Sequence, residues 1–349
     1  MMKHSVVHAV VGLLLLICCM AASSALADLD VYYLDVGQAD STLLVCDGHA
    51  LLIDGGNTDD AEKIVTMITD RIGTHALDAV IATHPHEDHI GGLKAVLNTF
   101  MVGTLYSPVT EYDGYHFVVM VDAADAQGLS ITVPTVGESF SFGDAEVTFL
   151  SPGHEYPDTN NMSIAVRVTY GSTAFVFTGD AEQLAEDDMV ASGMNLSADV
   201  LHIGHHGSAT STTVEFLSSV YPSYGVISVS SNNGYGHPVQ DTMDMLLYYG
   251  IMVYRTDMEG DIYCHSDGES ISFLTERDIE DDALLYQAYA EVELPSDIVY
   301  AYVGNANTMR LHLPECKSVS EMKEKNRMFF ETREEAIDLG FIPCGRCHP

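Results

Sequence analysis

Residues 83–92 read Thr83-His84-Pro85-His86-Glu87-Asp88-His89-Ile90-Gly91-Gly92 and carry most of the information about this chain. This stretch follows an apolar run, residues 77–82, that has the character of a buried strand. Imidazole and carboxylate are ligands that zinc, manganese and iron accept, and the spacing lets His84 and His86 bind one ion from a loop. Asp88 and His89 then face a second ion. A solvated histidine-rich turn is the alternative, but this order after a strand and before Gly-Gly indicates metal.

Further candidate ligands stand where other apolar runs meet turns. His154 follows the run that ends at residue 150, Asp180 follows the run that ends at residue 178, and the pair His205-His206 follows residues 200–204. A site with two ions needs ligands from several segments and one anion that bridges the ions. Because a rigid scaffold presents side chains from strand ends to a common cleft, we expect these residues to converge.

Strand-like and helix-like segments mix along residues 31–275. Amphipathic spacing predicts helices over residues 61–72, 91–100, 213–220 and 240–249, and short apolar runs between turn residues predict strands around them. Strands and helices that alternate in this way predict an α/β fold in which two sheets carry outer helices.

The charge is unevenly distributed over the 349 residues, whose formal net charge is -37. Residues 28–275 hold 36 acidic and 5 basic side chains, whereas residues 299–349 hold 7 of each. A surface this negative repels polyanions at long range, although salt screens exposed charges beyond about 8 Å. Nucleic acid is therefore not excluded as a substrate, but charge does not assist its approach.

Residues 1–27 have the pattern of a secretory signal peptide. Lys3 supplies the positive start, residues 6–22 are apolar, and Ala25-Leu26-Ala27 offers a small-x-small cleavage site. The apolar run is shorter than the roughly 20 residues of a membrane-spanning helix. We therefore expect a secreted or extracytoplasmic protein without a stable membrane span, the alternative being an uncleaved N-terminal anchor.

The C-terminal part carries its own candidate metal site. Residues 276–298 contain eight acidic side chains and one basic one, which predicts an acidic linker between a domain over 28–275 and another over 299–349. In the latter, His312-x3-Cys316 and Cys344-x2-Cys347 have the spacing of a closed structural zinc site. Export leaves a Cys344–Cys347 disulfide as the alternative.

Seven pieces of the chain, in this order, resemble the metallo-β-lactamase superfamily and, more closely, the hydrolase domain of ComEC-type competence proteins. They are Leu34-Asp35-Val36-Gly37-Gln38-Ala39-Asp40-Ser41, Ile53-Asp54-Gly55-Gly56, the histidine motif, Asn160-Asn161-Met162-Ser163, Thr178-Gly179-Asp180, His205-His206-Gly207-Ser208 and Asn233-Gly234-Tyr235-Gly236-His237-Pro238. The resemblance covers Leu29 to about Leu274. It implies an αββα sandwich with the metals at one edge.

Carried over residue by residue, the resemblance implies two divalent ions, zinc or manganese, with His84, His86 and His154 on one ion, Asp88, His89 and His205 on the other, and Asp180 as the bridge. Whether His205 or His206 binds metal stays open, and His205 is preferred because it follows the strand directly. His206 and His237 would then neutralise phosphate oxygens or protonate a leaving alkoxide. The candidate catalytic residues are Asp88, Asp180, His206 and His237. Asp54 and Asp35 are expected to orient histidines.

Residues 303–349 resemble the metal-binding domain of Ada-type DNA repair proteins, with Asn326-Arg327 and the Pro-Cys-x-x-Cys ending. This implies a small α+β domain with one structural zinc held by His312, Cys316, Cys344 and Cys347. The chain departs from that family at His312, which occupies the position of the methyl-accepting cysteine. Methyl transfer is therefore not expected.

Together these observations predict an exported two-metal hydrolase that acts on phosphodiesters, with DNA as the substrate suggested by the competence-type resemblance. A small ester is the alternative substrate, through a choline-phosphate esterase or lactonase activity, because a nuclease groove usually needs several bases. A third interpretation is a non-enzymatic protein that binds DNA or envelope material. The intact ligand series from residue 84 to residue 205 argues against it.

Overall fold

The computed structural model describes residues 28–277 and, in the C-terminal part, residues 302–347 except 307, 315, 321, 324, 325, 331, 340 and 345. The predicted signal peptide over residues 1–27 and nearly all of the predicted linker over 276–298 lie outside the described residues. The chain divides into two compact units after residue 280. Within the described part, none of the helices has the length and apolar character needed to cross a membrane.

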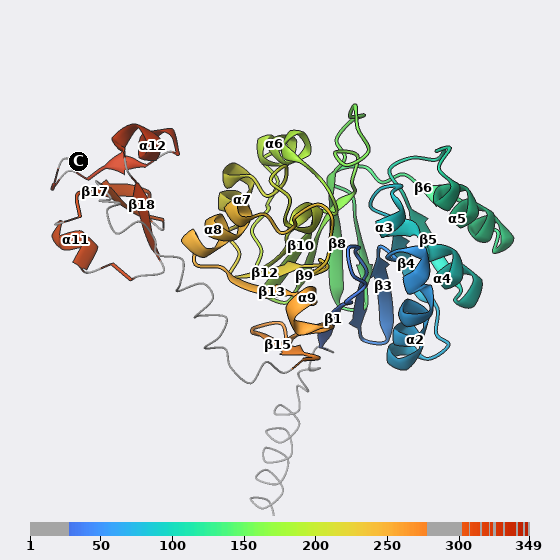
Figure 1. The fold of residues 1–349 in the computed structure, drawn as a ribbon. Helices are drawn as coiled ribbons and strands as arrows, with labels where there is room; N and C mark the ends of the chain where they lie inside the picture. Colours follow the sequence, from blue (N-terminus) through green and yellow to red (C-terminus); the bar gives the residue numbers. More distant parts are fainter. Residues whose placement is uncertain are drawn as a thin grey trace, which may run out of the picture. The chain divides into compact units, whose positions relative to one another are not determined.

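The first unit contains two β-sheets that stack face to face between helices (Figure 1). The eight-stranded sheet has the order β15 (Ile271–Thr275), β14 (Ile262–Ser266), β1 (Leu29–Tyr33), β2 (Thr42–Cys46), β3 (His49–Ile53), β4 (Leu77–Ile81), β5 (Val102–Tyr106) and β6 (Ile131–Thr132). The seven-stranded sheet has the order β13 (Met252–Arg255), β12 (Tyr224–Ile227), β11 (Val200–His202), β10 (Thr173–Phe177), β9 (Ala165–Tyr170), β8 (Ala145–Ser151) and β7 (Ser139–Phe142).

A large hydrophobic cluster lies between the two sheets. In β1, Val31 and Tyr33 are fully buried while their neighbours are less so, which is the period of two that a half-buried strand requires. Tyr33 stacks on Phe177 of β10 from the opposite sheet, with ring centroids 6.0 Å apart. Each aromatic side chain buried here contributes about 1.5–3 kcal/mol of stability, so this layer fixes how the two sheets sit on each other.

Helices cover the outer faces of both sheets (Figure 1). Ile64, Ile68 and Ile72 recur every fourth residue of α2, and this stripe packs on the eight-stranded sheet. Four helices come in the N-terminal half of this unit: α2 (Ala61–Ile72), α3 (Glu87–Ile90), α4 (Leu93–Thr99) and α5 (Tyr115–Ala126). Four more come in its C-terminal half: α6 (Gln183–Ala191), α7 (Val214–Val220), α8 (Gln240–Tyr248) and α9 (Thr256–Glu259). The layers confirm the predicted αββα sandwich.

The second unit is built on a four-stranded sheet with the order β18 (Arg327–Phe330), β16 (Tyr302–Asn305), β17 (Arg310–His312) and β19 (Ile342–Pro343). Two short helices accompany the sheet, α11 (Lys317–Ser320) and α12 (Arg333–Asp338). Phe330 and Phe341 pack in its core, and a Cβ at Gly304 would lie 2.5 Å from the Phe341 ring. Only glycine fits at this position of β16.

Candidate metal centre

The histidine motif lies where β4 ends and α3 begins. Close backbone contacts brace it: the Gly55 N–H donates to the His89 carbonyl at 2.6 Å, and the Gly92 N–H donates to the Gly55 carbonyl at 3.0 Å. A Cβ at Gly92 would stand 2.4 Å from the Gly55 oxygen. The Gly-Gly pair after the histidines therefore lets α3 rest directly on the loop that follows β3.

One group of four potential ligands consists of Asp88, His89, Asp180 and His206, whose ligand atoms all lie within 4.8 Å of one another. His89 Nε2 is 3.2 Å from Asp180 Oδ1 and 3.9 Å from Asp88 Oδ2. His206 Nε2 is 3.4 Å from Asp88 Oδ2 and 4.0 Å from Asp180 Oδ1. Two imidazole nitrogens and two carboxylates thus point at a common centre.

A second group consists of His84, His86 and Asp180. His84 Nε2 lies 3.0 Å from His86 Nδ1 and 3.6 Å from Asp180 Oδ2. Ligands about 2.0–2.2 Å from a tetrahedral ion are about 3.3–3.6 Å from each other, so these separations are close to those of a bound ion. Asp180 belongs to both groups, because its Oδ1 faces His89 and His206 while its Oδ2 faces His84.

Unpaired buried atoms indicate that cations fit here. Among the described residues, His89 Nε2, His206 Nε2 and Asp180 Oδ1 are buried without a hydrogen bond of acceptable geometry. Burial alone would lower the pKa of His89 and of His206, but the surrounding carboxylates, Asp180 foremost for His89 and Asp40 for His206, raise both well above the usual value. The site therefore demands positive charge, which divalent ions satisfy.

The other nitrogen of each of these histidines is held by a polar group. His89 Nδ1 is 2.8 Å from Asp54 Oδ2, and Asp54 also accepts hydrogen bonds from the N–H and hydroxyl of Thr83. His206 Nδ1 donates to the Ser228 carbonyl at 2.8 Å. These contacts fix the tautomer that leaves Nε2 free for an ion. Burial raises the pKa of Asp54 to about 6, although His89 lowers it.

His205 and His206 follow β11 (Val200–His202), and the structure places His206, not the preferred His205, among the potential ligands. Both have left-handed backbone angles, with φ of 51° and 55°. His206 is buried within the ligand group, whereas the His205 side chain is 20% exposed. His205 Nε2 lies 3.6 Å from Asp180 Oδ2, Nδ1 lies 3.4 Å from Glu182 Oε1, and the ring is 5.6 Å from that of His237.

The comparison with known protein families agrees with this geometry. Residues 34–230, more than half of the chain, match the family described as "Metallo-beta-lactamase superfamily". The chain belongs to this superfamily. Residues 286–349 match the family described as "Metal binding domain of Ada". Both resemblances recognised in the sequence are thus confirmed.

Two relatives of this superfamily member are competence proteins. ComE operon protein 3 of Bacillus subtilis is 31% identical over 253 residues, which are 67% of this chain and 32% of the relative. Competence protein ComA of Neisseria gonorrhoeae is 30% identical over 229 residues, 65% of this chain and 30% of the relative. The chain therefore spans about a third of the length of these relatives. Among solved structures, the metallo-beta-lactamase fold protein YhfI from Bacillus subtilis aligns with a TM-score of 0.46 and 15% identity, covering 68% of this chain and 99% of YhfI.

Two residues expected at the metallo-beta-lactamase site lie elsewhere. The His154 side chain is 61% exposed, contacts the Tyr156 ring and faces Asp188 at 3.6 Å, so the structure does not bring it to His84 and His86. The loop after β8 carries it to the surface. Asp35 pairs with Arg277 at 2.6 Å instead of orienting a histidine.

Two further residues at the site were not predicted. Asp40 is buried beside His206, and the Thr159 hydroxyl lies 2.7 Å from His86 Nε2. Asp40 and Thr159 each lie in or next to a segment that carries the superfamily resemblance, but neither matches a ligand pattern. His237 stands at the open side, where Nδ1 is buried without a hydrogen-bond partner among the described residues and the ring stacks on Tyr235.

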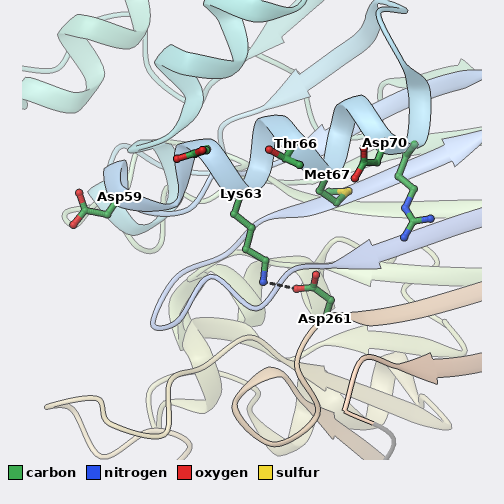
Figure 2. A pocket seen from close by; sticks show the side chains of 8 residues that line it. Asp59, Lys63, Thr66, Met67, Asp70 and Asp261 are labelled. Carbon is green, nitrogen blue, oxygen red and sulfur yellow. Dashed lines mark hydrogen bonds and ion pairs between the residues drawn. The ribbon is translucent and has the colours of Figure 1, made fainter.

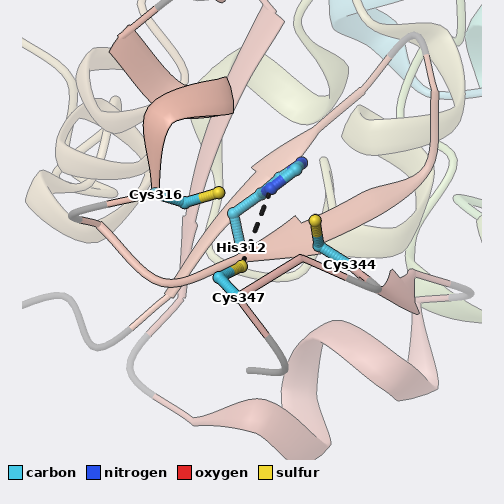
Figure 3. Close-up of side chains that lie close together, drawn as sticks. All are labelled: His312, Cys316, Cys344 and Cys347. Atoms are coloured by element: carbon cyan, nitrogen blue, oxygen red, sulfur yellow. Dashed lines mark hydrogen bonds between the residues drawn. The ribbon is translucent and has the colours of Figure 1, made fainter.

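The C-terminal unit holds a separate cluster. Figure 3 shows His312, Cys316, Cys344 and Cys347 converging, and their ligand atoms all lie within 4.8 Å of one another. None of the three cysteines forms a disulfide, so the alternative Cys344–Cys347 bond is absent from the described structure. A histidine and three thiolates are a donor set typical of structural zinc. Together with the family match, this indicates divalent metal binding in the second unit.

The described surface also has a pocket of about 550 Å³ between α2 and the segment that carries Asp261 (Figure 2). The ion pair between Lys63 and Asp261, 2.7 Å long, crosses it. Asp59, Glu62 and Asp70 also line it. None of the candidate ligands lines it, so this pocket is distinct from the metal centre.

Proposed function

We propose that this superfamily hydrolase is an exported phosphodiesterase that acts on DNA. The single observation that carries the reaction class is the shared carboxylate of Asp180, which faces His84 on one side and His89 on the other. Two ligand groups that share one anion suit a pair of ions about 3.5–4 Å apart. When bound, such ions supply the acidity that activates water and the charge that stabilises a developing oxyanion.

The chain's own residues supply orientation and a proton. His205 stands on the open side of Asp180, and Glu182 lies against its Nδ1, which leaves His205 Nε2 directed toward the site. From this position His205 protonates the leaving alkoxide, and His237 beside it contacts the phosphoryl oxygens. The role that the sequence suggested for His206 thus passes to His205, because His206 is buried among the ligands.

The substrate and the location are supported by different observations. DNA is favoured by two relatives that are competence proteins, although the chain spans only about a third of their length. Export is favoured by the signal-like pattern of residues 1–27. The same pattern would place the reaction outside the cytoplasm.

The test is hydrolysis of single-stranded DNA and bis-nitrophenyl phosphate by the protein loaded with Mn²⁺ or Zn²⁺. We expect both substrates to be cleaved, and His86→Ala to lower the rate at least about 100-fold through loss of an ion. His154→Ala is the matched control, since His154 is exposed and away from the ligands. Hydrolysis of bis-nitrophenyl phosphate but not of single-stranded DNA would refute the nuclease proposal. Equal rates for His86→Ala and the parent protein would refute the metal mechanism.

A small ester is the second candidate, and the charge of the first unit favours it. With 36 acidic and 5 basic side chains over residues 28–275, the unit attracts a cationic head group more readily than a polyanion. Nitrophenyl phosphorylcholine and a lactone are therefore included in the same assay. Faster turnover of either one than of bis-nitrophenyl phosphate would favour this candidate.

A further inference from the structure

Asp40 is a buried carboxylate that none of the predicted roles uses. It lies in the loop between β1 and β2 and is 4% exposed. The Asp40 N–H donates to the Asp88 carbonyl at 3.0 Å, and the Asp40 carbonyl accepts from the Gly56 N–H at 2.8 Å. The backbone of Asp40 is thus bound to both loops that carry the site.

The side chain of Asp40 faces the histidines of only one ligand group. Its Oδ1 is 3.3 Å from His206 Nδ1, and its Oδ2 is 4.0 Å from His89 Nδ1. These are the nitrogens that point away from the ion position. The structure gives no ion-pair contact between Asp40 and His84 or His86 among the described residues.

Asp40 does not serve as the hydrogen-bond partner of His206. His206 Nδ1 already donates to the Ser228 carbonyl at 2.8 Å, and Asp40 Oδ1 is buried without a hydrogen bond among the described residues. The nearest other imidazole is His202, whose Nδ1 is 3.8 Å away and whose Nε2 is 2.9 Å from the Ser228 hydroxyl. A buried carboxylate with so few partners is costly unless positive charge stands nearby.

The charges of the site supply a reason for Asp40. Two divalent ions among neutral imidazoles carry four positive charges, and the ligands Asp88 and Asp180 together with Asp54 offer three negative charges. Asp40 is the fourth carboxylate, on the side of His89 and His206. With it, the buried site is electrically balanced.

We propose that Asp40 is a positioning residue that strengthens binding of the ion held by Asp88, His89 and His206, and not of the ion held by His84 and His86. The proposal rests on the two-ion site of the proposed function. Polar groups held against the outer nitrogen of a ligand histidine typically change metal affinity by about 10–100-fold, and Asp40 Oδ1 lies 3.3 Å from that nitrogen of His206. Because Asp40 touches one ligand group, its loss is selective.

The test is titration of the metal-depleted full chain with Mn²⁺ by calorimetry. Mn²⁺ is the probe because the thiolates of the C-terminal cluster favour zinc. Asp40→Asn is expected to raise the Kd of one Mn²⁺ ion about 10–100-fold and leave the other unchanged. Asp35→Asn is the matched control, since Asp35 comes from the same loop but pairs with Arg277.

Double variants identify the affected ion. In the His206→Ala background, where the ion of His84 and His86 remains, adding Asp40→Asn should leave the Kd for Mn²⁺ unchanged. In the His86→Ala background, adding Asp40→Asn should raise the Kd of the remaining ion. Equal weakening of both ions, or wild-type affinity in Asp40→Asn, would overturn the proposal. If Asp40→Asn does not fold, Asp40→Ser, which leaves room for a water, is titrated with the same two outcomes. Failure of the parent protein to bind two Mn²⁺ ions would instead overturn the proposed function.

Discussion

At the scale of single residues, the pair His205-His206 shows what a pattern of residue types leaves open. Two successive residues in left-handed backbone conformations do not follow the alternation of a strand, so position after β11 does not tell which ring points inward. The contact that decides is His206 Nδ1 with the Ser228 carbonyl, 22 positions later in the chain. His206 and Ser228 are too far apart in the chain for a local sequence pattern to reveal this contact.

Exchanging each histidine for glutamine separates the two roles. His206→Gln is expected to release one ion, because it removes a buried ligand nitrogen, and to lower diester hydrolysis at least about 100-fold. His205→Gln is expected to keep both ions and to lower hydrolysis about 10²–10⁴-fold, which is typical for loss of a general acid. Metal content by mass spectrometry and initial rates check this. Loss of an ion only in His205→Gln would reverse the assignment.

The other site residues also differ in whether the sequence alone could reveal them. His84, His86, Asp88 and His89 could be predicted because they lie within six positions of one another after a strand. The structure does not bring His154 to His84 and His86, because a histidine at a strand end says nothing about the direction of the loop that follows, and here it lies at the surface beside Tyr156 and Asp188. Asp40 was missed because its role depends on buried charge, which a linear pattern does not contain.

At the scale of elements, amphipathic spacing found some helices and missed others. The stripe Ile64, Ile68 and Ile72 predicted α2 with the bounds that it has, Ala61–Ile72. Two of the longer helices were not predicted. In α5, Tyr115–Ala126, apolar residues occur around most of the helix, and in α6, Gln183–Ala191, a charged residue, Glu186, is among those buried. Neither shows the expected contrast between two faces.

Glu186 of α6 gives a pH prediction. It is fully buried and accepts hydrogen bonds from the backbone N–H groups of Thr212 and Thr213, just before α7. Burial raises the pKa of Glu186 to about 7 from 4.5, although the Thr213 and Thr212 contacts lower it. Since the folded state holds this proton more tightly than the unfolded state, its contribution to stability is present below pH 4.5 and is lost as the pH rises through 7.

The comparison with Glu186→Gln isolates this effect, because glutamine does not titrate. Between pH 5 and 8, the free energy of unfolding of the parent protein should fall relative to that of Glu186→Gln by up to about 3 kcal/mol. Urea unfolding at several pH values measures the difference. A difference that stays constant over this range would show that Glu186 has no raised pKa in the folded protein.

At the scale of the whole molecule, each unit has its own core and its own group of potential metal ligands, and the chain divides between them after residue 280. We therefore expect Cys316→Ser to lower the zinc content by one ion and leave diester hydrolysis unchanged, because it removes a thiolate only from the C-terminal cluster. Cys264→Ser is the cysteine control, since Cys264 lies in β14 and should not change the zinc content. Loss of hydrolysis in Cys316→Ser would show that the second unit supports the active site.

The charge of the whole molecule makes the salt dependence of DNA cleavage the sharpest test of the substrate. A nuclease that tracks DNA with basic residues loses affinity as salt rises. Here residues 28–275 hold 36 acidic against 5 basic side chains, so approach of DNA is opposed by repulsion, which acts over about 30 Å at 0.01 M salt and about 10 Å at 0.1 M. Raising NaCl between these concentrations should therefore increase kcat/KM for single-stranded DNA, while bis-nitrophenyl phosphate, with one charge, changes little. A decrease for DNA would instead mean that a basic track binds it, and the seven basic residues of 299–349 would be the first to replace.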